Sequence, residues 1–252
     1  MQMNAGGVRM EYAVVALAAF LGGVLQGVTG FGAGLVLMMA LPMLYTVPSA
    51  AAVSGIIFLV LSIAMTVQYR ESLQPKQIVL PLICYMVLSG SSAYFATVAT
   101  DQVLIKRAFG FFLILLSIYY LFLHERFGER HMGKAAGALC VVVSGLCDGL
   151  FGIGGPLLVV YFLDRFETRE ARLGSLQLFF SINAVYTTVV RAVAGAFPPH
   201  ALGSIAIGSI SIGVGLVVAN AIQSKIDDAL LRKVTYVLIG ACGVIQLANG
   251  LI

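Results

Sequence analysis

Two short segments of the chain are unusually rich in glycine, and each interrupts an otherwise apolar stretch. The first covers residues 26–34 (QGVTGFGAG) and the second residues 148–156 (DGLFGIGGP). Because a glycine inside a helix costs about 1 kcal/mol relative to alanine, we expect helices to unwind at both segments. A helix that restarts after such a break exposes backbone N–H groups and the positive end of its dipole, which together bind anions without a basic side chain. These residues therefore favour anion binding by backbone amides.

Both interruptions must be shielded from lipid. An unsatisfied amide inside a bilayer costs several kcal/mol, so unwound backbone is tolerated only against protein or a watery cavity. We expect the two breaks to meet inside the protein, with new helices starting near Leu35 and Leu157, where Pro156 suits the first turn. Close helix packing is the alternative explanation, and it accounts for Gly23 and Gly27 but not for the crowding that follows them.

Few polar side chains accompany the breaks, and Gln26 and Asp148 hold matched positions at their start. A carboxylate at the centre of a bilayer costs about 2.5–3.5 kcal/mol on insertion scales, so Asp148 needs a role. It could carry a proton and couple the protein to a proton gradient, or it could be a structural carboxylate that caps neighbouring N–H groups. The predicted anion-binding residues are Gln26, Thr29, Gly30, Gly32, Gly34, Gly152, Gly154, Gly155, Gln177 and Arg191.

A polar stripe runs through the apolar segment at residues 174–193. Gln177, Ser181, Thr188 and Arg191 follow one another at spacings of four, seven and three, which places them on one helical face. Such a face is expected to turn toward protein or water rather than lipid. Arg191 could attract an anion at the mouth of the pathway; the alternative, which we favour, is that its side chain snorkels to the membrane interface.

The elements that must position these residues are transmembrane helices. The chain has 252 residues, of which 60% are hydrophobic and only 10% charged, whereas a soluble domain carries roughly 25% charged residues. A transmembrane helix needs about 20 mostly apolar residues. Candidate spans lie at residues 49–69, 78–99, 108–123, 174–193, 201–222 and 234–252. The sequence thus predicts an all-α polytopic membrane protein.

The two halves of the chain are related to each other. A shift of 122 positions pairs four glycines around the first break with four around the second, namely Gly23, Gly27, Gly30 and Gly32 with Gly145, Gly149, Gly152 and Gly154. Each half opens with a glycine-broken segment and continues with three spans, as in the internal duplications of secondary transporters. We place the first four-segment repeat at residues 1–125 and the second at residues 126–252, within one integral domain.

Loop charges discriminate between two topologies. If both broken segments cross the membrane, the Lys and Arg residues divide seven to eight between its two sides. If both segments are re-entrant, one side holds Arg9, Lys106, Arg107 and Arg191, and the other holds the remaining 11 of the 15 Lys and Arg residues. Because cytoplasmic loops collect these residues, we favour re-entrant segments, which make the two repeats inverted.

Motifs for enzyme chemistry are missing from the sequence. It contains no H-E-x-x-H motif and no Walker-type loop, and His124, His131 and His200 lie in loops. We therefore expect no enzyme activity, no cofactor and no metal site. The net charge of +4 arises from loop residues that set topology, so nucleic acid is not an expected partner. The expected partners are the lipid bilayer and a small anion, and a homodimer is left open.

The paired motifs G-x-x-G-x-G-x-G at residues 27–34 and G-x-x-G-x-G-G-P at residues 149–156 resemble those of the sulfite exporter TauE/SafE family, also called the 4-toluene sulfonate uptake permeases. The resemblance covers nearly the whole chain, although Ala33 stands where the second motif has Gly155. It implies a secondary transporter that moves sulfite, an organosulfonate or a related sulfur oxyanion across the bacterial inner membrane, driven by an ion gradient. A passive anion channel is the alternative. A membrane-embedded enzyme or assembly factor of sulfur metabolism is a third hypothesis, against which stands the lack of a nucleophile with a base at usable spacing.

Overall fold

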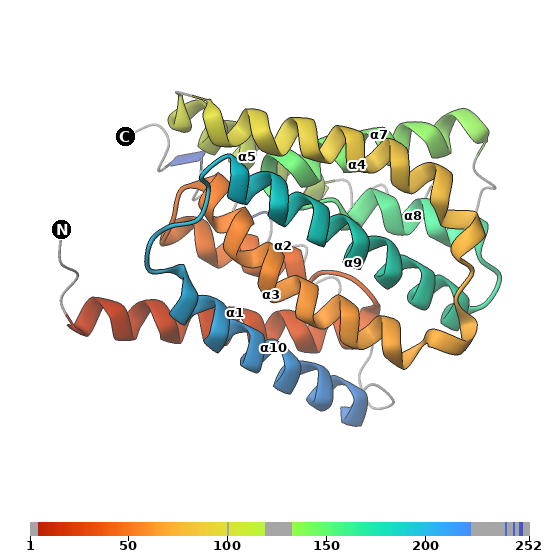
Figure 1. Cartoon of the computed structure of the whole chain (residues 1–252), viewed down its shortest axis with the longest axis horizontal. Coiled ribbons are helices and arrows are strands. Elements are labelled where there is room, and N and C mark those ends of the chain that lie inside the picture. The colour runs from red at the N-terminus through yellow and green to blue at the C-terminus, as the bar shows by residue number, and fades with distance from the viewer. Residues whose placement is uncertain are drawn as a thin grey trace.

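The computed structural model describes residues 5–99, 101–118 and 133–222, together with residues 240, 244, 247 and 248. Every regular element within these ranges is helical (Figure 1). The α-helices are α1 (Ala5–Thr29), α2 (Ala33–Ala40), α3 (Val47–Gln68), α4 (Pro75–Val98), α5 (Gln102–Ile118), α7 (Lys134–Phe151), α8 (Gly155–Arg165), α9 (Arg169–Val193) and α10 (Ala201–Ile222). Two 3₁₀ turns, η1 (Leu41–Met43) and η2 (Arg70–Ser72), flank α3.

Six of the described helices are long and apolar enough to cross a membrane, namely α1 from Arg9 onward, α3, α4, α7, α9 and α10. Their outer faces expose large apolar side chains such as Leu80, Val193 and Leu202, each at least 80% exposed. Rows of such side chains suit a lipid-facing surface and would be a liability in water. The prediction of an all-α polytopic membrane protein is therefore confirmed.

Predicted and observed spans agree closely where both are described. The spans at residues 49–69, 78–99 and 174–193 correspond to α3, α4 and α9 with differences of at most five residues, and the span at residues 201–222 coincides with α10. The predicted span at residues 108–123 begins later than α5, which starts at Gln102 and is described to Ile118. The predicted span at residues 234–252 and the repeat boundary at residue 125 lie outside the described residues, apart from four isolated positions in that span.

The helices pack as two groups, which we name the first bundle (α1, α2, α3 and α10) and the second bundle (α4, α7, α8 and α9). Each bundle has its own hydrophobic core. The core of the second bundle includes Tyr85, Phe162 and Phe179. The core of the first bundle also takes in apolar side chains of α5, such as Phe109 and Leu113. The two bundles meet mainly along α3 and α9, which lie between α1 and α10 on one side and α4 and α7 on the other (Figure 1).

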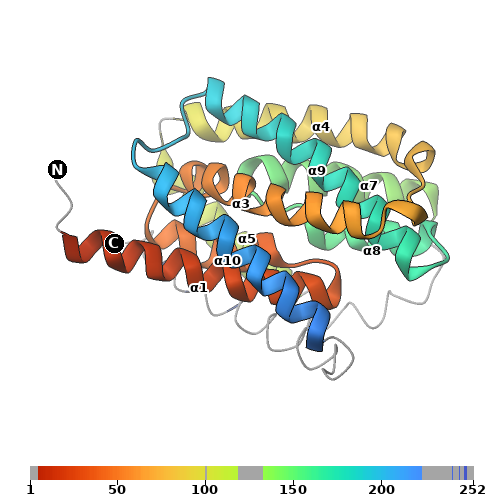
Figure 2. The ribbon, with the colours of Figure 1, turned by 60° about the horizontal axis from the view of Figure 1, so that its bottom comes forward.

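The bundles do not coincide with the two halves of the sequence. Helix α10 lies in the second half of the chain but packs along α1, and both views of the ribbon show this pair side by side (Figure 2). Helix α4 lies in the first half but packs along α7. Helices are thus exchanged between the halves, so that each broken helix is supported by a span from the opposite half.

Helix boundaries recur at one fixed interval along the chain. Three pairs of boundaries are each separated by 122 positions: the ends of α1 and α7 (Thr29 and Phe151), the starts of α2 and α8 (Ala33 and Gly155), and the starts of α3 and α9 (Val47 and Arg169). This is the interval that pairs the glycines in the sequence.

Both broken helices turn back on themselves. At the start of α8, a Cβ added to Gly154 would meet Asp148 Cβ at 2.7 Å, and near its end Tyr161 packs 3.2 Å from a Cβ placed on Gly137, close to the start of α7. Helix α8 therefore runs back along α7. Likewise, α2 returns against α1, because a Cβ on Gly22 would lie 3.2 Å from the Cα of Ala33 at the start of α2, and Tyr45, shortly after α2, donates to Glu11 near the start of α1.

Candidate functional site

The glycine-rich segments break their helices as the sequence predicts. Helix α1 ends at Thr29, and the next residues include Gly30 with φ 85° and Gly32 with φ 113°. Helix α7 ends before Gly152, whose φ is 68°. Only glycine adopts these left-handed conformations without a steric penalty, so the breaks follow directly from these positions. The new helices start at Ala33 and Gly155, two residues before the predicted starts.

Close packing explains the glycines that precede each break. A side chain at Gly23 would run into the carbonyl oxygen of Ile212 on α10, and one at Gly149 would run into the carbonyl oxygen of Ser89 on α4. Small residues let membrane helices approach this closely. The packing interpretation therefore holds for the last turns of α1 and α7, and the unwinding interpretation holds for the glycines that follow.

Two fully buried glutamines hold the first break in place. Gln177 Nε2 donates to the carbonyl oxygen of Gly30 at 3.0 Å, and Gln26 Nε2 donates to Gln177 Oε1 at 3.0 Å. The amide of Ala33 in turn donates to Gln26 Oε1 at 3.0 Å. Thr29 Oγ1 lies 2.8 Å from the carbonyl oxygen of Leu25 and 2.7 Å from that of Phe31, and its single hydroxyl proton can be donated to either. A side chain from α9 thus fixes the unwound backbone between α1 and α2.

Helix α9 also holds the second break. Arg191 Nη2 donates to the carbonyl oxygens of Asp148 and Gly149, in the last turn of α7, at 2.9 and 3.0 Å. The Asp148 carbonyl also accepts from the amide of Gly152 at 2.7 Å, which closes the end of the helix. Asn183 Nδ2 donates to Asp148 Oδ2 at 2.8 Å, and Ser89 Oγ of α4 donates to Asn183 Oδ1 at 2.8 Å. Arg191, Asp148 and Asn183 therefore form one network around the end of α7.

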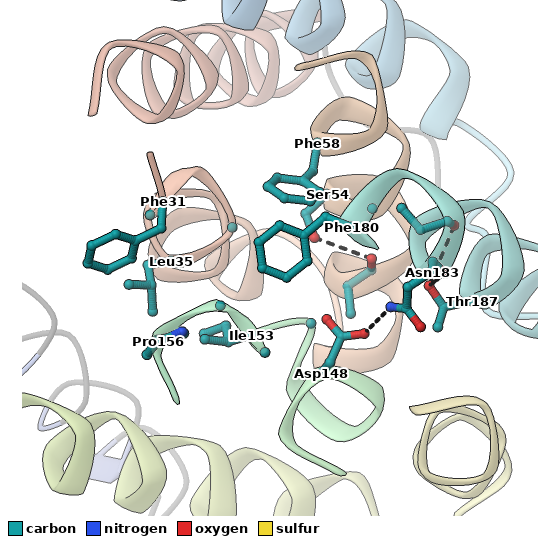
Figure 3. A pocket seen from close by; sticks show the side chains of 18 of the residues that line it. Phe31, Leu35, Ser54, Phe58, Asp148, Ile153, Pro156, Phe180, Asn183 and Thr187 are labelled. Carbon is teal, nitrogen blue, oxygen red and sulfur yellow. Dashed lines mark hydrogen bonds between the residues drawn. The ribbon is translucent and has the colours of Figure 1, made fainter. Parts of the chain in front are cut away.

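A cavity lies between the two breaks (Figure 3). The breaks approach each other closely, because a Cβ on Gly34 would lie 3.5 Å from the carbonyl oxygen of Gly152. The space in which the centre of a water-sized sphere can move measures about 50 Å³. Residues from α3 and α9 complete the walls, and the polar side chains among all lining residues are Gln26, Ser54, Asp148, Asn183, Thr187 and Arg191. The expectation that the breaks meet inside the protein is confirmed.

Backbone donors at this cavity come from both restarted helices. The amides of Gly34 and Leu35 at the start of α2, and of Gly155 at the start of α8, donate to no acceptor among the described residues. All three residues line the cavity. First-turn amides of this kind carry the positive end of the helix dipole. Positive potential therefore converges on the cavity from two helices.

Arg191 adds a full charge to this potential. The residue is only 3% exposed, so the favoured interpretation that it snorkels to the interface is wrong. Its Nη2 atom is used by the carbonyls of α7, whereas Nη1 lies 3.9 Å from a Cβ placed on Gly55, another lining residue. The guanidinium therefore clamps the second break with one nitrogen and keeps a second nitrogen near the cavity.

The predicted binding residues divide into lining and supporting groups. Those that line the cavity are Gln26, Gly32, Gly34, Gly152, Gly154, Gly155 and Arg191, together with the predicted proton carrier Asp148. Thr29, Gly30 and Gln177 are not among its lining residues and instead fix the first break through the hydrogen bonds described above. For both groups, a direct role in anion binding stays a prediction.

The polar stripe on α9 faces inward as predicted at Gln177, Ser181 and Arg191, which are all buried, but not at Thr188. Asn183 and Thr187 line the cavity together with Arg191, whereas Thr188 is only half-buried and does not line it. These three lining residues follow one another at intervals of four, which is a helical spacing visible in the sequence. Ser54 and Gly55 of α3 also line the cavity, although they were not predicted from the sequence as site residues.

Of the described residues, no group of three or more His, Cys, Asp or Glu side chains could hold a metal ion.

The fold and the cavity define a class: a multi-pass helical membrane protein with a buried polar cavity between two broken helices. Residues 15–245 match the family described as Sulfite exporter TauE/SafE, and the chain belongs to this family. The resemblance drawn from the glycine motifs is thereby confirmed.

One relative of this chain is the "Probable membrane transporter protein MJ0441" of Methanocaldococcus jannaschii. It is 26% identical over 155 residues, which are 60% of this chain and 57% of the relative. The match thus spans less than two thirds of the relative's length. No solved structure matches the chain.

Proposed function

We propose that this protein is a secondary transporter that carries a small anion, sulfite or a related sulfur oxyanion, across the inner membrane of a bacterium. The observation that carries the proposal is the buried cavity into which two helix N-termini and Arg191 direct positive charge. Such a site replaces the water shell of an oxyanion with fixed donors. Membership of the Sulfite exporter TauE/SafE family and the name of the archaeal relative both support transport.

The size of the cavity favours a very small substrate. A buried water needs about 10–15 Å³ of space for its centre, so the cavity of about 50 Å³ has room for roughly three to five water-sized groups. Sulfite, with one sulfur and three oxygens, fits this space. An arylsulfonate is larger and would need the walls to move apart.

Two inverted repeats with re-entrant broken helices form the scaffold in this proposal. The 122-residue interval between matching helix boundaries supports the duplication. The return of α2 along α1 and of α8 along α7 supports re-entrant segments. Alternating access by rocking of one bundle against the other is the mechanism that such duplications commonly serve. Because helices are exchanged between the halves, the moving units in this proposal are the two bundles and not the two sequence halves.

Asp148 offers a physical route to ion coupling. Its carboxylate lines the same cavity as Arg191, so in its charged form it repels an entering anion. Protonation removes that repulsion, and by thermodynamic linkage the binding of a proton and of an anion would then favour each other. The arrangement thus supports co-transport of a proton with the anion. In this mechanism Asp148 is the group that carries the proton.

Arg191 provides the test of the site. Two unit charges 4 Å apart attract by about 4 kcal/mol at an effective dielectric constant of about 20, which corresponds to roughly a 10³-fold change in affinity. We expect Arg191→Met to weaken sulfite binding by about 10²–10³-fold, and Arg191→Lys, which keeps the charge, to lie between this variant and the wild type. Arg165→Met, at the exposed end of α8, is the matched control and should bind normally.

Binding is measured by calorimetry on purified protein, and transport by sulfite uptake into proteoliposomes. Saturable uptake that depends on an imposed ion gradient supports a carrier, whereas non-saturable flux that ignores the gradient supports the passive channel instead. Wild-type affinity in Arg191→Met would contradict the proposed site.

A further inference from the structure

Two phenylalanines from the central helices form a wall of the cavity. Phe58 of α3 and Phe180 of α9 pack edge to face, with ring centroids 5.5 Å apart and an interplanar angle of 73°. Both line the cavity, and their rings lie next to each other in the close-up view (Figure 3). They are also 122 positions apart, so they occupy matched places in the two halves of the chain.

The ring pair marks one end of the cavity. Helices α3 and α9 run antiparallel, because Gly55 lies near Arg191 while Tyr69, at the other end of α3, lies near Gly174. Every α3 residue that lines the cavity is Phe58 or precedes it, and every lining residue of α9 is Phe180 or follows it. The cavity therefore stops at the two rings on the side where α3 ends and α9 begins.

Beyond the rings, the seam between the same two helices continues toward the surface. Thr66, about two turns past Phe58 on α3, faces Ser181, the neighbour of Phe180 on α9, and their hydroxyl oxygens are 3.4 Å apart. Farther along, a surface hollow of about 400 Å³ lies at the end of α3 and includes Arg70 and Glu170. The hydroxyl pair thus lies beside the Phe180 end of the ring pair, and the surface hollow lies beyond both pairs.

The ring pair also lies where the two bundles meet. Phe58 packs against the cores of both bundles, and Phe180 belongs to the core of the second. A motion that separates the bundles along α3 and α9 would therefore part the rings. The contact between the rings contains no hydrogen bond that would have to be broken, and an apolar constriction excludes a hydrated anion when closed.

We propose that Phe58 and Phe180 form the gate that closes the anion cavity toward the end of α3, and that they set the upper limit on substrate size there. This inference rests on the proposed transport function. In the closed state the rings keep water and anion from passing along the α3–α9 seam, and in the open state the hydroxyls of Thr66 and Ser181 line the passage.

The test compares leak through gate variants with that through a matched aromatic control. Phe58→Leu, Phe180→Leu and the double variant are reconstituted, and the efflux of preloaded sulfite is followed without any ion gradient. Phe162→Leu is the control, because Phe162 is a fully buried ring of the second bundle that packs against Phe166 and Phe179 instead of lining the cavity. We expect at least about a tenfold faster leak in the double variant and no change in the control.

Substrate size supplies a second measurement, with benzenesulfonate as the larger probe. The double variant should admit benzenesulfonate at least about tenfold faster than the wild type. Retention of sulfite binding shows that each variant is folded. Phe58→Leu changes a half-buried position, so this single variant can still be tested if the double variant does not fold.

Failure of the gate and failure of the transport function give different results. Double-variant vesicles that bind sulfite yet hold it as tightly as the wild type and exclude benzenesulfonate would overturn the gate. A wild type that neither binds nor moves sulfite would overturn the proposed function, and the gate with it.

Discussion

Adding one methyl group to the cavity should weaken anion binding without weakening the fold. Gly34 and Gly155 both line the cavity, and neither has a positive φ. A Cβ on Gly34 would find its nearest neighbour at 3.5 Å and a Cβ on Gly155 at 3.7 Å, which are ordinary van der Waals contacts. Gly34→Ala and Gly155→Ala are therefore free of the backbone strain that any substitution of Gly32 or Gly152 would introduce.

These substitutions should raise the stability of the protein but lower its affinity for sulfite. Replacing a glycine by alanine at a compatible position stabilises a protein by about 0.4–1 kcal/mol, because the unfolded chain loses conformational freedom. The methyl group takes the place of one of the roughly three to five water-sized groups that the cavity of about 50 Å³ can hold. Overfilling a packed site costs about 1–3 kcal/mol, so sulfite affinity should fall about 5- to 150-fold.

Each variant needs a thermal melt without ligand, a sulfite titration by calorimetry and initial uptake rates in proteoliposomes. Gly213→Ala is the matched control, since a Cβ there meets no atom within 4 Å and the residue lies on α10 away from the cavity. It should gain stability and keep its sulfite affinity. Wild-type sulfite affinity in both Gly34→Ala and Gly155→Ala would refute the assignment of the substrate to this cavity.

Two further predictions concern buried acidic residues. Asp148→Asn should remove the part of the pH dependence of sulfite uptake that comes from this carboxylate, because an amide cannot exchange the proton that relieves repulsion; uptake rates from pH 5 to 8 that still follow the wild-type profile would leave Asp148 only a structural role. Tyr45→Phe should lower stability by about 1–3 kcal/mol, since the Tyr45 hydroxyl and Ser204 both donate to the buried carboxylate of Glu11. Burial and the hydrogen bond to Glu11 raise the pKa of Tyr45 to about 12, so the hydroxyl stays protonated and the difference in melting temperature should be constant from pH 6 to 9. The exposed Tyr94→Phe is its control, and an equal effect in both variants would contradict the assignment.

The sequence was sufficient to locate the breaks because glycine acts locally. Each glycine lowers helix stability at its own position, and four recurrences at one interval identify both segments without any knowledge of the tertiary structure. That the breaks meet also follows from a general constraint, because unsatisfied amides cannot face lipid. These two arguments need no information on which helices are neighbours.

Side-chain roles were harder to predict because they depend on helix rotation and pairing. Thr188 and Thr187 differ by one residue, which turns a side chain by about 100° on a helix of 3.6 residues per turn, and only Thr187 reaches the cavity. The direction of the Arg191 side chain depends on its hydrogen bonds to carbonyls of α7, which lie more than 40 residues earlier in the chain. The exchange of α4 and α10 between the bundles likewise has no local signature, because the apolar residues of both helices are spread around the helix instead of gathered on one face.

The two halves share three helix boundaries at one interval, but their side chains at matched positions differ in chemistry. The three polar residues of α9 that line the cavity have apolar or aromatic counterparts 122 positions earlier, with Leu61 matching Asn183, Met65 matching Thr187 and Tyr69 matching Arg191. Leu61 and Met65 are buried in the core of the first bundle, so that part of α3 contributes to packing where α9 contributes to the polar wall. Gln26, which is neutral, likewise matches the acidic Asp148. Because the only full charges among the lining residues sit beside the second break, an anion held here would be bound unequally by the two breaks. The first break would supply neutral amide donors, while the second would supply the charge that selects an anion and the carboxylate that can respond to protons.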